Sequence, residues 1–394
     1  MKTENIKNNI SKSIEKVKNI GKKISRVIDE VKENLSHNFF NYIEEYGDYT
    51  FEEREFNEID NVILSMLAYV DFKGIVSENS KDKKSIYTIT KEYFEVHPKS
   101  ELKQVLIPGR LGAKLLNRMA NKRRYRDILA FNYLSISNAD SQFSAITFDL
   151  GKRNYYVAFE GTDLLISGWE EDCKMAYSFP VEAQKLAKAY LKRYTFKFVK
   201  LIIGGHSKGG NLALVSSMYT NFLVRWKIKR IYSNDGLGLR DEQINSKKYK
   251  RIEKKYISII PDSSIVGLML RHKDNYVVIK SNMPGLVSHD TNTWQVDGDK
   301  FVRAKLTRFS RVFDDGFSRW LDKYSDEERE QFVKSVFDIM REHEIETLMQ
   351  FANNYKLILE VIKSSRKVDK IVKDMTKDLF KVISQTNLEY PLFK

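Results

Sequence analysis

The spacing of apolar residues changes along this 394-residue chain and divides it into regions with different predicted structures. Over residues 1–38, once Gly21 is skipped, the spacing alternates between four and three residues, at Ile10, Ile14, Val17, Ile24, Ile28, Val31 and Leu35. This pattern predicts a long amphipathic helix with a narrow apolar stripe. Such a helix is expected to dock on its own chain, to self-associate, or to lie on a membrane surface.

Helical spacing continues in the next part of the chain, at residues 57–72 and again at 101–133. The polar stretch 76–100 between them is predicted to be mostly loop. From residue 143 the pattern becomes a series of short apolar runs separated by turns and by one helical stretch, 181–194. These runs predict strands at 143–148, 155–159, 196–203, 228–232, 256–260, 276–280 and 293–296.

Short apolar strands that alternate with helices are typical of an α/β fold with a mostly parallel sheet covered by helices on both faces. Residues 301–394 are charged and helical in spacing, and Ser325 to Glu328 has the form of a helix-capping box. We therefore expect a helical N-terminal extension at 1–40, an α/β domain at 41–300 and a helical C-terminal extension at 301–394.

Composition narrows the classes of protein that are compatible with this chain. The single cysteine, Cys173, excludes an internal disulfide and a cysteine-rich zinc site, and the six histidines show no ligand spacing, so we expect neither metal nor cofactor. No apolar run is long enough for a membrane span, and the polar N-terminus lacks the apolar region of a signal peptide. The expected location is the cytoplasm.

The net charge of +14 raises the question of an anionic partner. Two basic clusters stand out, Lys114 to Arg126 and Lys247 to Arg251. They are read either as solvated helix faces or as a surface for peripheral contact with an anionic membrane. Neither lies in a nucleic-acid-binding motif, so no specific nucleic acid partner is expected.

The strongest chemical signal is Gly205-His206-Ser207-Lys208-Gly209, which follows an apolar strand and precedes a helical run. This is the pattern of a nucleophile elbow, in which serine occupies the tip of a tight strand-to-helix turn. The N–H of Lys208 would be one oxyanion donor. The loop Phe159 to Asp163 would supply the other, with the Thr162 hydroxyl as a further donor.

A serine nucleophile needs a base and an acid, which follow it along the chain in this type of fold. Three histidines follow Ser207, namely His272, His289 and His343, and His289 is favoured because it lies in a loop after the last core strand. Two aspartates end neighbouring strands, Asp235 and Asp262. Both remain candidates for the acid, with a slight preference for Asp235 because of the glycines around it.

Three stretches together resemble class 3 (fungal-type) lipases: Val157 to Thr162, Gly168 to Asp172 and Gly205 to Ala213. A group of bacterial lipase-like α/β-hydrolases is more similar still, and this likeness extends over residues 42–345. The resemblance implies an α/β-hydrolase fold and a Ser-His-Asp mechanism on carboxylic esters without a metal. The chain departs from the class 3 pattern at Lys208, at Glu160 and at Ser264, which stands where the acid is usual.

From these residues we expect a serine esterase or lipase that hydrolyses acyl or lipid esters through an acyl-enzyme, with Ser207 as nucleophile and His289 as base. The alternative is an inactive scaffold on a hydrolase fold that binds a membrane or a protein partner. In the scaffold alternative the N-terminal helix would engage the membrane or the partner, and self-association through this helix is a further possibility.

Overall fold

The computed structural model describes residues 37–386, apart from 80, 106, 138–140, 164–165, 274–275, 348–349, 351–358, 360 and 363–367. The helix predicted over residues 1–38 therefore lies outside the described residues, except for its last two positions. Among the described helices, none combines the length and the apolar character needed to cross a bilayer.

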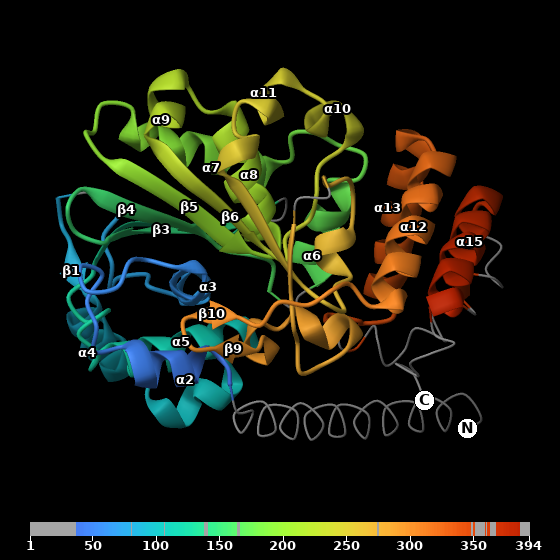
Figure 1. The fold of residues 1–394 in the computed structure, drawn as a ribbon. Coiled ribbons are helices and arrows are strands. Elements are labelled where there is room, and N and C mark those ends of the chain that lie inside the picture. The colour runs from blue at the N-terminus through green and yellow to red at the C-terminus, as the bar shows by residue number, and fades with distance from the viewer. Residues whose placement is uncertain are drawn as a thin grey trace.

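An eight-stranded sheet forms the centre of the molecule, and its strands follow one another in chain order (Figure 1). The first four strands pair in antiparallel fashion, and every pair from β4 to β8 is parallel. The predicted α/β fold with a mostly parallel sheet is confirmed. The strands are β1 (Lys84–Ser85), β2 (Leu129–Ser137), β3 (Gln142–Asp149), β4 (Asn154–Phe159), β5 (Lys200–His206), β6 (Ile228–Asn234), β7 (Tyr256–Pro261) and β8 (Val277–Ile279).

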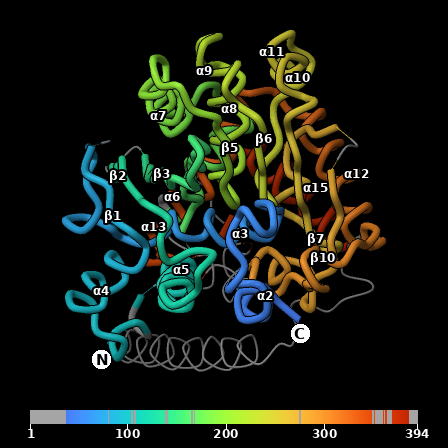
Figure 2. The backbone as a smooth tube through the Cα atoms, turned by 60° about the vertical axis from the view of Figure 1, so that its left-hand side comes forward, coloured from blue at the N-terminus to red at the C-terminus, as the bar shows by residue number. Residues whose placement is uncertain are grey.

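Helices cover both faces of the sheet, as Figures 1 and 2 show. One face is covered by α3 (Glu58–Met66), with α2 (Phe39–Tyr46), α4 (Ile86–Val96) and α5 (Ile107–Met119) around it. The other face is covered by α7 (Glu182–Leu191) and α8 (Lys208–Tyr219). Both α3 and α8 are buried almost all round, because each lies between the sheet and a further layer of helix.

The C-terminal part of the chain forms a helical layer beside the sheet (Figure 1). The hairpin of β9 (Val296–Asp297) and β10 (Lys300–Phe301) leads into it. Phe313, Phe317 and Trp320 pack against Leu237 and Leu268 from the loops that follow the central strands. Ser325 caps α13 with the reciprocal bond to Glu328 that its sequence predicts. The helices of this layer are α12 (Arg308–Lys323), α13 (Asp326–Glu342) and α15 (Lys370–Thr386).

The connections between these layers contain several short helices. Among them, α6 (Ile166–Lys174) packs against α13, and α9 (Phe222–Lys227) precedes β6. Two more, α10 (Asp241–Ile244) and α11 (Lys247–Lys250), lie between β6 and β7.

Three segments differ from the sequence-based expectation. The helix predicted for 101–133 ends in α5, and Leu129 onward forms β2, because pairing with β3 outweighs local spacing. The loop predicted for 76–100 contains α4, whose buried face of Ile86, Ile89 and Tyr93 has helical spacing. The strand predicted to start at residue 196 begins at Lys200 instead.

A buried ion pair holds segments of the N-terminal helical layer together. The guanidinium of Arg124 contacts both carboxylate oxygens of Asp60, at 2.6 and 2.8 Å, and both side chains are 0% exposed. Its other N–H groups donate to the carbonyls of Tyr49, Arg54 and Glu55. Arg124 is therefore a buried structural group and does not belong to a solvated or membrane-facing surface, whereas the interpretation of the rest of the 114–126 cluster stays a prediction.

Three neighbouring cations of that cluster also form ion pairs. Arg118 pairs with Glu44, Lys122 with Glu44 and Asp48, and Arg123 with Glu53. These pairs place carboxylates beside three cations of the cluster, and contact of this face with an anionic membrane stays a prediction.

We expect Arg124→Met to lower the free energy of unfolding by about 3–5 kcal/mol, because it leaves Asp60 buried without its counter-charge. Arg123→Met is the matched control, since the side chain of Arg123 is 61% exposed, and its effect should stay within about 0.5 kcal/mol. Urea denaturation of both variants, followed by tryptophan fluorescence, measures the difference. Equal stability of the two variants would contradict the structural role of the buried pair.

Candidate functional site

The turn between β5 and α8 holds Ser207 in a conformation that side chains rarely adopt. Its φ is 56° and its ψ is −130°. A Cβ on Gly209 would lie 2.2 Å from the carbonyl oxygen of Phe159, so the helix can approach β4 only with glycine at this position. Backbone strain of this kind persists where the surrounding structure holds it, and it is common at reactive residues.

The hydroxyl of Ser207 is buried and unengaged. The residue is 1% exposed, and its Oγ has no hydrogen-bond partner among the residues that the structure describes. A buried hydroxyl without a partner costs free energy, so this arrangement contributes nothing to stability. It is the state expected of a group reserved for a ligand.

His289 and Asp235 form the acid–base pair beside this turn. His289 ends the short 3-10 helix η6 (Gly285–His289), and its Nδ1 lies 2.6 Å from Oδ2 of Asp235 at the end of β6. The other carboxylate oxygen of Asp235 accepts from Ser264 Oγ at 2.5 Å and from Gly267 N at 3.1 Å. Since a carboxylate accepts, Nδ1 carries the hydrogen, which leaves Nε2 of His289 as the basic nitrogen.

Asp262, the second candidate acid, is engaged elsewhere. Its carboxylate accepts from Lys280 Nζ at 2.7 Å, and its carbonyl accepts from Thr307 N at 2.8 Å at the start of α12. It thus ties β7 to the neighbouring strand and to the C-terminal layer. The structure therefore brings Asp235, and not Asp262, to His289. The other two histidines lie apart: His272 is near Asp314, and His343 is at the end of α13.

His206, the residue before Ser207, holds the loop that carries His289. Its Nε2 donates to the carbonyl of His289 at 2.8 Å, and the two rings are 4.4 Å apart between centroids. Its Nδ1 therefore accepts from the hydroxyl of Tyr69, at 2.9 Å. Burial lowers the pKa of His206 to about 3, so the ring is neutral and its two hydrogen bonds have fixed directions.

The loop after β4 packs directly against the serine. A Cβ on Gly161 would lie 3.0 Å from Cβ of Ser207 and 2.0 Å from the hydroxyl oxygen of Tyr69, so no side chain fits there. The hydroxyl of Thr162 donates to Asp172 Oδ2 at 2.6 Å. Its hydrogen is used in that bond, which corrects the expectation that this hydroxyl is an oxyanion donor and leaves the main-chain N–H of Thr162 for that role.

Lys208 is the first residue of α8, where main-chain N–H groups lack intrahelical partners. Its side chain forms a buried ion pair with Glu171 of α6, at 3.1 Å, and both side chains are less than 5% exposed. The ammonium also donates to the carbonyl of Gln142 at 2.8 Å. Glu171 accepts further bonds from Ser141 Oγ and Ala183 N, so both buried charges are compensated.

Two more carboxyl groups near the loop have raised pKa values. Desolvation raises the pKa of Asp172 to about 6 and that of Glu160 to about 8, and the charge of Lys208 partly opposes both shifts. Asp172 also keeps its bond from Thr162. Within the described ranges, no group of three histidine, cysteine, aspartate or glutamate side chains is placed to hold a metal ion.

The site also contains residues that the sequence patterns did not identify. Ser264, Glu171 and Asp172 bind Asp235, Lys208 and Thr162 respectively, and Tyr69 binds His206. Ser264 carried a signal, because it stands at the position where class 3 lipases have their acid, and Glu171 and Asp172 lie in one of the stretches that resemble those lipases, whereas no pattern pointed to Tyr69. In the structure this serine donates to the acid instead.

The order of the strands, the turn after β5 and the histidine loop after β8 define a lipase-like α/β-hydrolase fold. A model of the Mbeg1-like family matches residues 119–338, which is more than half of the chain. The protein therefore belongs to the Mbeg1-like family. No curated protein matches it significantly.

Two solved structures have a similar arrangement. One is a fungal lipase–inhibitor complex, with 14% identity, 56% of this chain and 76% of that chain covered, and a TM-score of 0.32. The other is the M37 lipase, with 13% identity, 54% and 70% covered, and a TM-score of 0.28. Such low values bear on no residue of the site, whose description depends on the contacts above.

Glu160 gives a testable pH dependence of stability. Because its pKa is about 8 when folded and 4.5 ordinarily, the folded state keeps this proton while the unfolded state loses it, so stability falls as pH rises between these values. We expect the free energy of unfolding of Glu160→Gln to rise relative to that of the wild type by roughly 2 kcal/mol or more as the pH increases through this window. Urea unfolding from pH 4 to pH 9 measures it.

The exposed Glu182→Gln is the control, and its stability should run parallel to that of the wild type across the same pH range. Parallel curves for Glu160→Gln and the wild type would show instead that Glu160 ionises alike in both states.

Proposed function

We propose that this protein is a serine hydrolase that cleaves carboxylic esters through an acyl-enzyme. The observation that carries the proposal is the strained turn at Ser207, beside the hydrogen-bonded pair of His289 and Asp235. His206 precedes Ser207 in the chain and contacts the ring of His289, with the two rings tilted by 34° and their centroids 4.4 Å apart, so the proposed base lies next to the turn of Ser207. Nucleophilic catalysis requires a serine hydroxyl within reach of an oriented imidazole. Ser207 Oγ forms no hydrogen bond with His289 in this structure, and we propose that this contact forms when an ester binds, since catalytic hydrogen bonds commonly tighten only in the complex.

In the proposed reaction, Ser207 Oγ attacks the ester carbonyl carbon while its proton passes to Nε2 of His289. The charge on Asp235 stabilises the imidazolium that forms, and the N–H groups of Lys208 and Thr162 stabilise the oxyanion. The C–O bond to the alcohol then breaks, and His289 returns the proton to the leaving oxygen. Water, deprotonated by the same imidazole, hydrolyses the acyl-enzyme and restores the serine.

The substrate class proposed is an acyl ester, with lipid esters included. The resemblance to class 3 lipases supports a lipid, whereas the buried Lys208–Glu171 pair marks a departure from that group at the position next to the nucleophile. The acyl length of the ester is therefore varied in the experiment, because preferential hydrolysis of short chains indicates an esterase and of long chains a lipase.

Ser207→Ala should lower ester hydrolysis by about 10⁴-fold or more, because the covalent step is lost. Purified protein is assayed on p-nitrophenyl esters of increasing acyl length, together with labelling by a fluorophosphonate probe. Ser216→Ala is the matched control, since it removes another buried hydroxyl of α8 and should keep labelling and activity. A wild type that neither reacts with the probe nor hydrolyses any ester would favour the non-catalytic scaffold.

Asp235→Asn should lower kcat by about 10²-fold to 10⁴-fold, because the imidazolium loses its stabilising charge. Asp262→Asn should leave kcat within a few-fold and instead lower the melting temperature, since Asp262 joins β7 to Lys280 and α12. Both variants are compared by steady-state kinetics and thermal unfolding. If kcat fell in Asp262→Asn and not in Asp235→Asn, Asp262 and not Asp235 would be the acid that assists His289.

A further inference from the structure

The end of the sheet opposite Ser207 carries exposed aromatic side chains. Phe196 and Phe198, in the segment before β5, are 88% and 86% exposed, although their sequence predicts a buried strand. Phe222 and Trp226 of α9 are 69% and 78% exposed. These four residues are named the aromatic patch.

The two segments of the patch are held together as one surface. The side chain of Asn221 donates to Thr195 Oγ1 at 3.0 Å, and Lys227 Nζ donates to the carbonyls of Tyr194 and Thr195 at 2.7 and 2.6 Å. The aromatic side chains are therefore not the ends of loose loops. They are presented by a short helix (α9 in Figure 1) and a fixed segment at the starts of β5 and β6.

The two segments that carry these rings contain basic residues and no acidic ones. Segments 192–200 and 221–230 contain no aspartate or glutamate, and their basic residues are Lys192, Arg193, Lys197, Lys200, Arg225, Lys227, Lys229 and Arg230. Lys255, from the segment before β7, donates to the carbonyl of Arg225 at 3.2 Å and extends the positive surface. Burial lowers the pKa of Lys255, and the nearby charges of Lys229 and Arg225 lower it further.

Unlike the cluster at 114–126, this one is not neutralised. Lys197, Lys200 and Lys229 are exposed and have no carboxylate partner within the part of the chain that the structure describes. A compact region of unpaired positive charge attracts an anionic partner and repels a second copy of itself. Self-association through this surface is therefore disfavoured.

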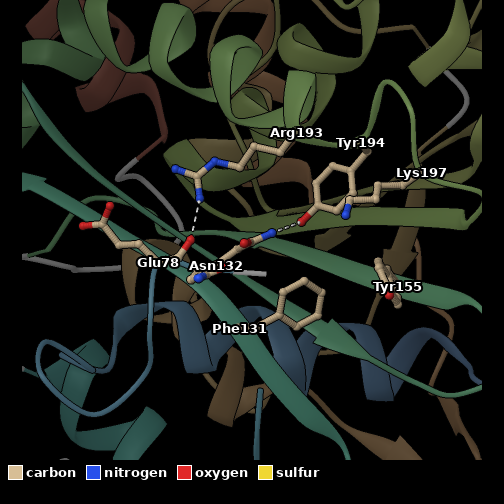
Figure 3. Close-up of a pocket in the computed structure, with 8 residues that line it drawn as sticks. Glu78, Phe131, Asn132, Tyr155, Arg193, Tyr194 and Lys197 are labelled. Atoms are coloured by element: carbon tan, nitrogen blue, oxygen red, sulfur yellow. Dashed lines mark hydrogen bonds between the residues drawn. The ribbon is translucent and has the colours of Figure 1, made fainter. Parts of the chain in front are cut away.

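A pocket of about 300 Å³ opens beside the patch and carries the same charge (Figure 3). Arg193, Tyr194 and Lys197 form one side of it, and Asn132 and Phe131 of β2 form the other. Figure 3 shows the carboxylate of Glu78 pointing away from these residues, while its main-chain oxygen accepts from Arg193 at 3.4 Å. Two cations next to an amide and aromatic walls suit an anionic head group.

We propose that this end of the sheet is a docking surface for a membrane that contains anionic phospholipids. Protruding phenylalanine and tryptophan rings enter the boundary between head groups and acyl chains, and the lysine and arginine side chains around them bind the phosphates. A single-stranded nucleic acid would need a groove in which bases stack, whereas rings that are more than two-thirds exposed project outward.

The geometry adds a consequence for the site of Ser207. β5 runs from Lys200 at the docking end to His206 at the other, and seven residues of strand span about 20 Å. A membrane bound at the patch thus lies away from the serine. Docking and ester hydrolysis are expected to be separable, and the docking proposal does not depend on the proposed function.

The test uses the full chain and two kinds of vesicle, phosphatidylcholine alone and phosphatidylcholine mixed with phosphatidylglycerol. We expect co-sedimentation with the anionic vesicles only, weakened by added salt. Phe196→Ser/Phe198→Ser/Trp226→Ser should lower the partition coefficient by roughly 10-fold or more. Val96→Ser, at an apolar position of α4 that is 65% exposed and lies outside the patch, should not. Lys197→Gln/Lys229→Gln should weaken binding, by roughly 5-fold per cation, more than Arg118→Gln/Arg123→Gln.

Trp226 is the most exposed of the four tryptophans and provides a readout of insertion, because Trp294 and Trp320 are buried and Trp169 is partly buried against the C-terminal helices. Phospholipids brominated on the acyl chain should quench the wild type and not Trp226→Phe. Ser207→Ala should bind vesicles normally, and the triple variant should hydrolyse soluble ester at the wild-type rate, if the wild type does. Unchanged binding by the triple variant, no binding to anionic vesicles, or preferential binding to single-stranded homopolymers without quenching would overturn the proposal.

Discussion

The close approach of three backbone segments around Ser207 is the constraint on which the site depends. The end of β4, the tip of the turn after β5 and the first turn of α8 come so near that Gly161 and Gly209 cannot carry side chains. Within this turn Ser207 has a positive φ of 56°, and Lys208 begins α8 directly after it. A side chain on either glycine would push these segments apart and disturb the turn.

Buried electrostatic contacts hold the segments in that position. A lysine directly after the nucleophile is tolerated because Glu171 and the carbonyl of Gln142 compensate its charge away from the serine. Tyr69 and His206 connect the helical layer on one face of the sheet to the loop of His289 through neutral hydrogen bonds. The base is thereby oriented from two sides, by Asp235 at Nδ1 and by His206 at its own carbonyl, so its freedom to rotate or shift is small.

The sequence was sufficient for the elements whose signals are local. Alternation and apolar runs located β3, β4, β6 and β7, and glycine spacing located the turn at Ser207, because each depends on residues close together in the chain. It did not separate Asp235 from Asp262, since both end neighbouring parallel strands at one edge, and only the position of the loop of His289 distinguishes them. Tyr69 lies 137 residues from its partner His206, a contact that no local pattern encodes.

The mistaken start of β5 is informative for the same reason. Phe196 and Phe198 alternate with polar residues as strand residues do, so local spacing placed them in the sheet. In the structure no neighbouring strand pairs with them, and they remain exposed next to unpaired cations. Exposed aromatic rings contribute nothing to the core, so their presence is better explained by an external contact than by folding. Under the two proposals, the parallel strands separate two tasks physically, with Ser207 at their carboxyl ends and the membrane-docking surface at their amino ends.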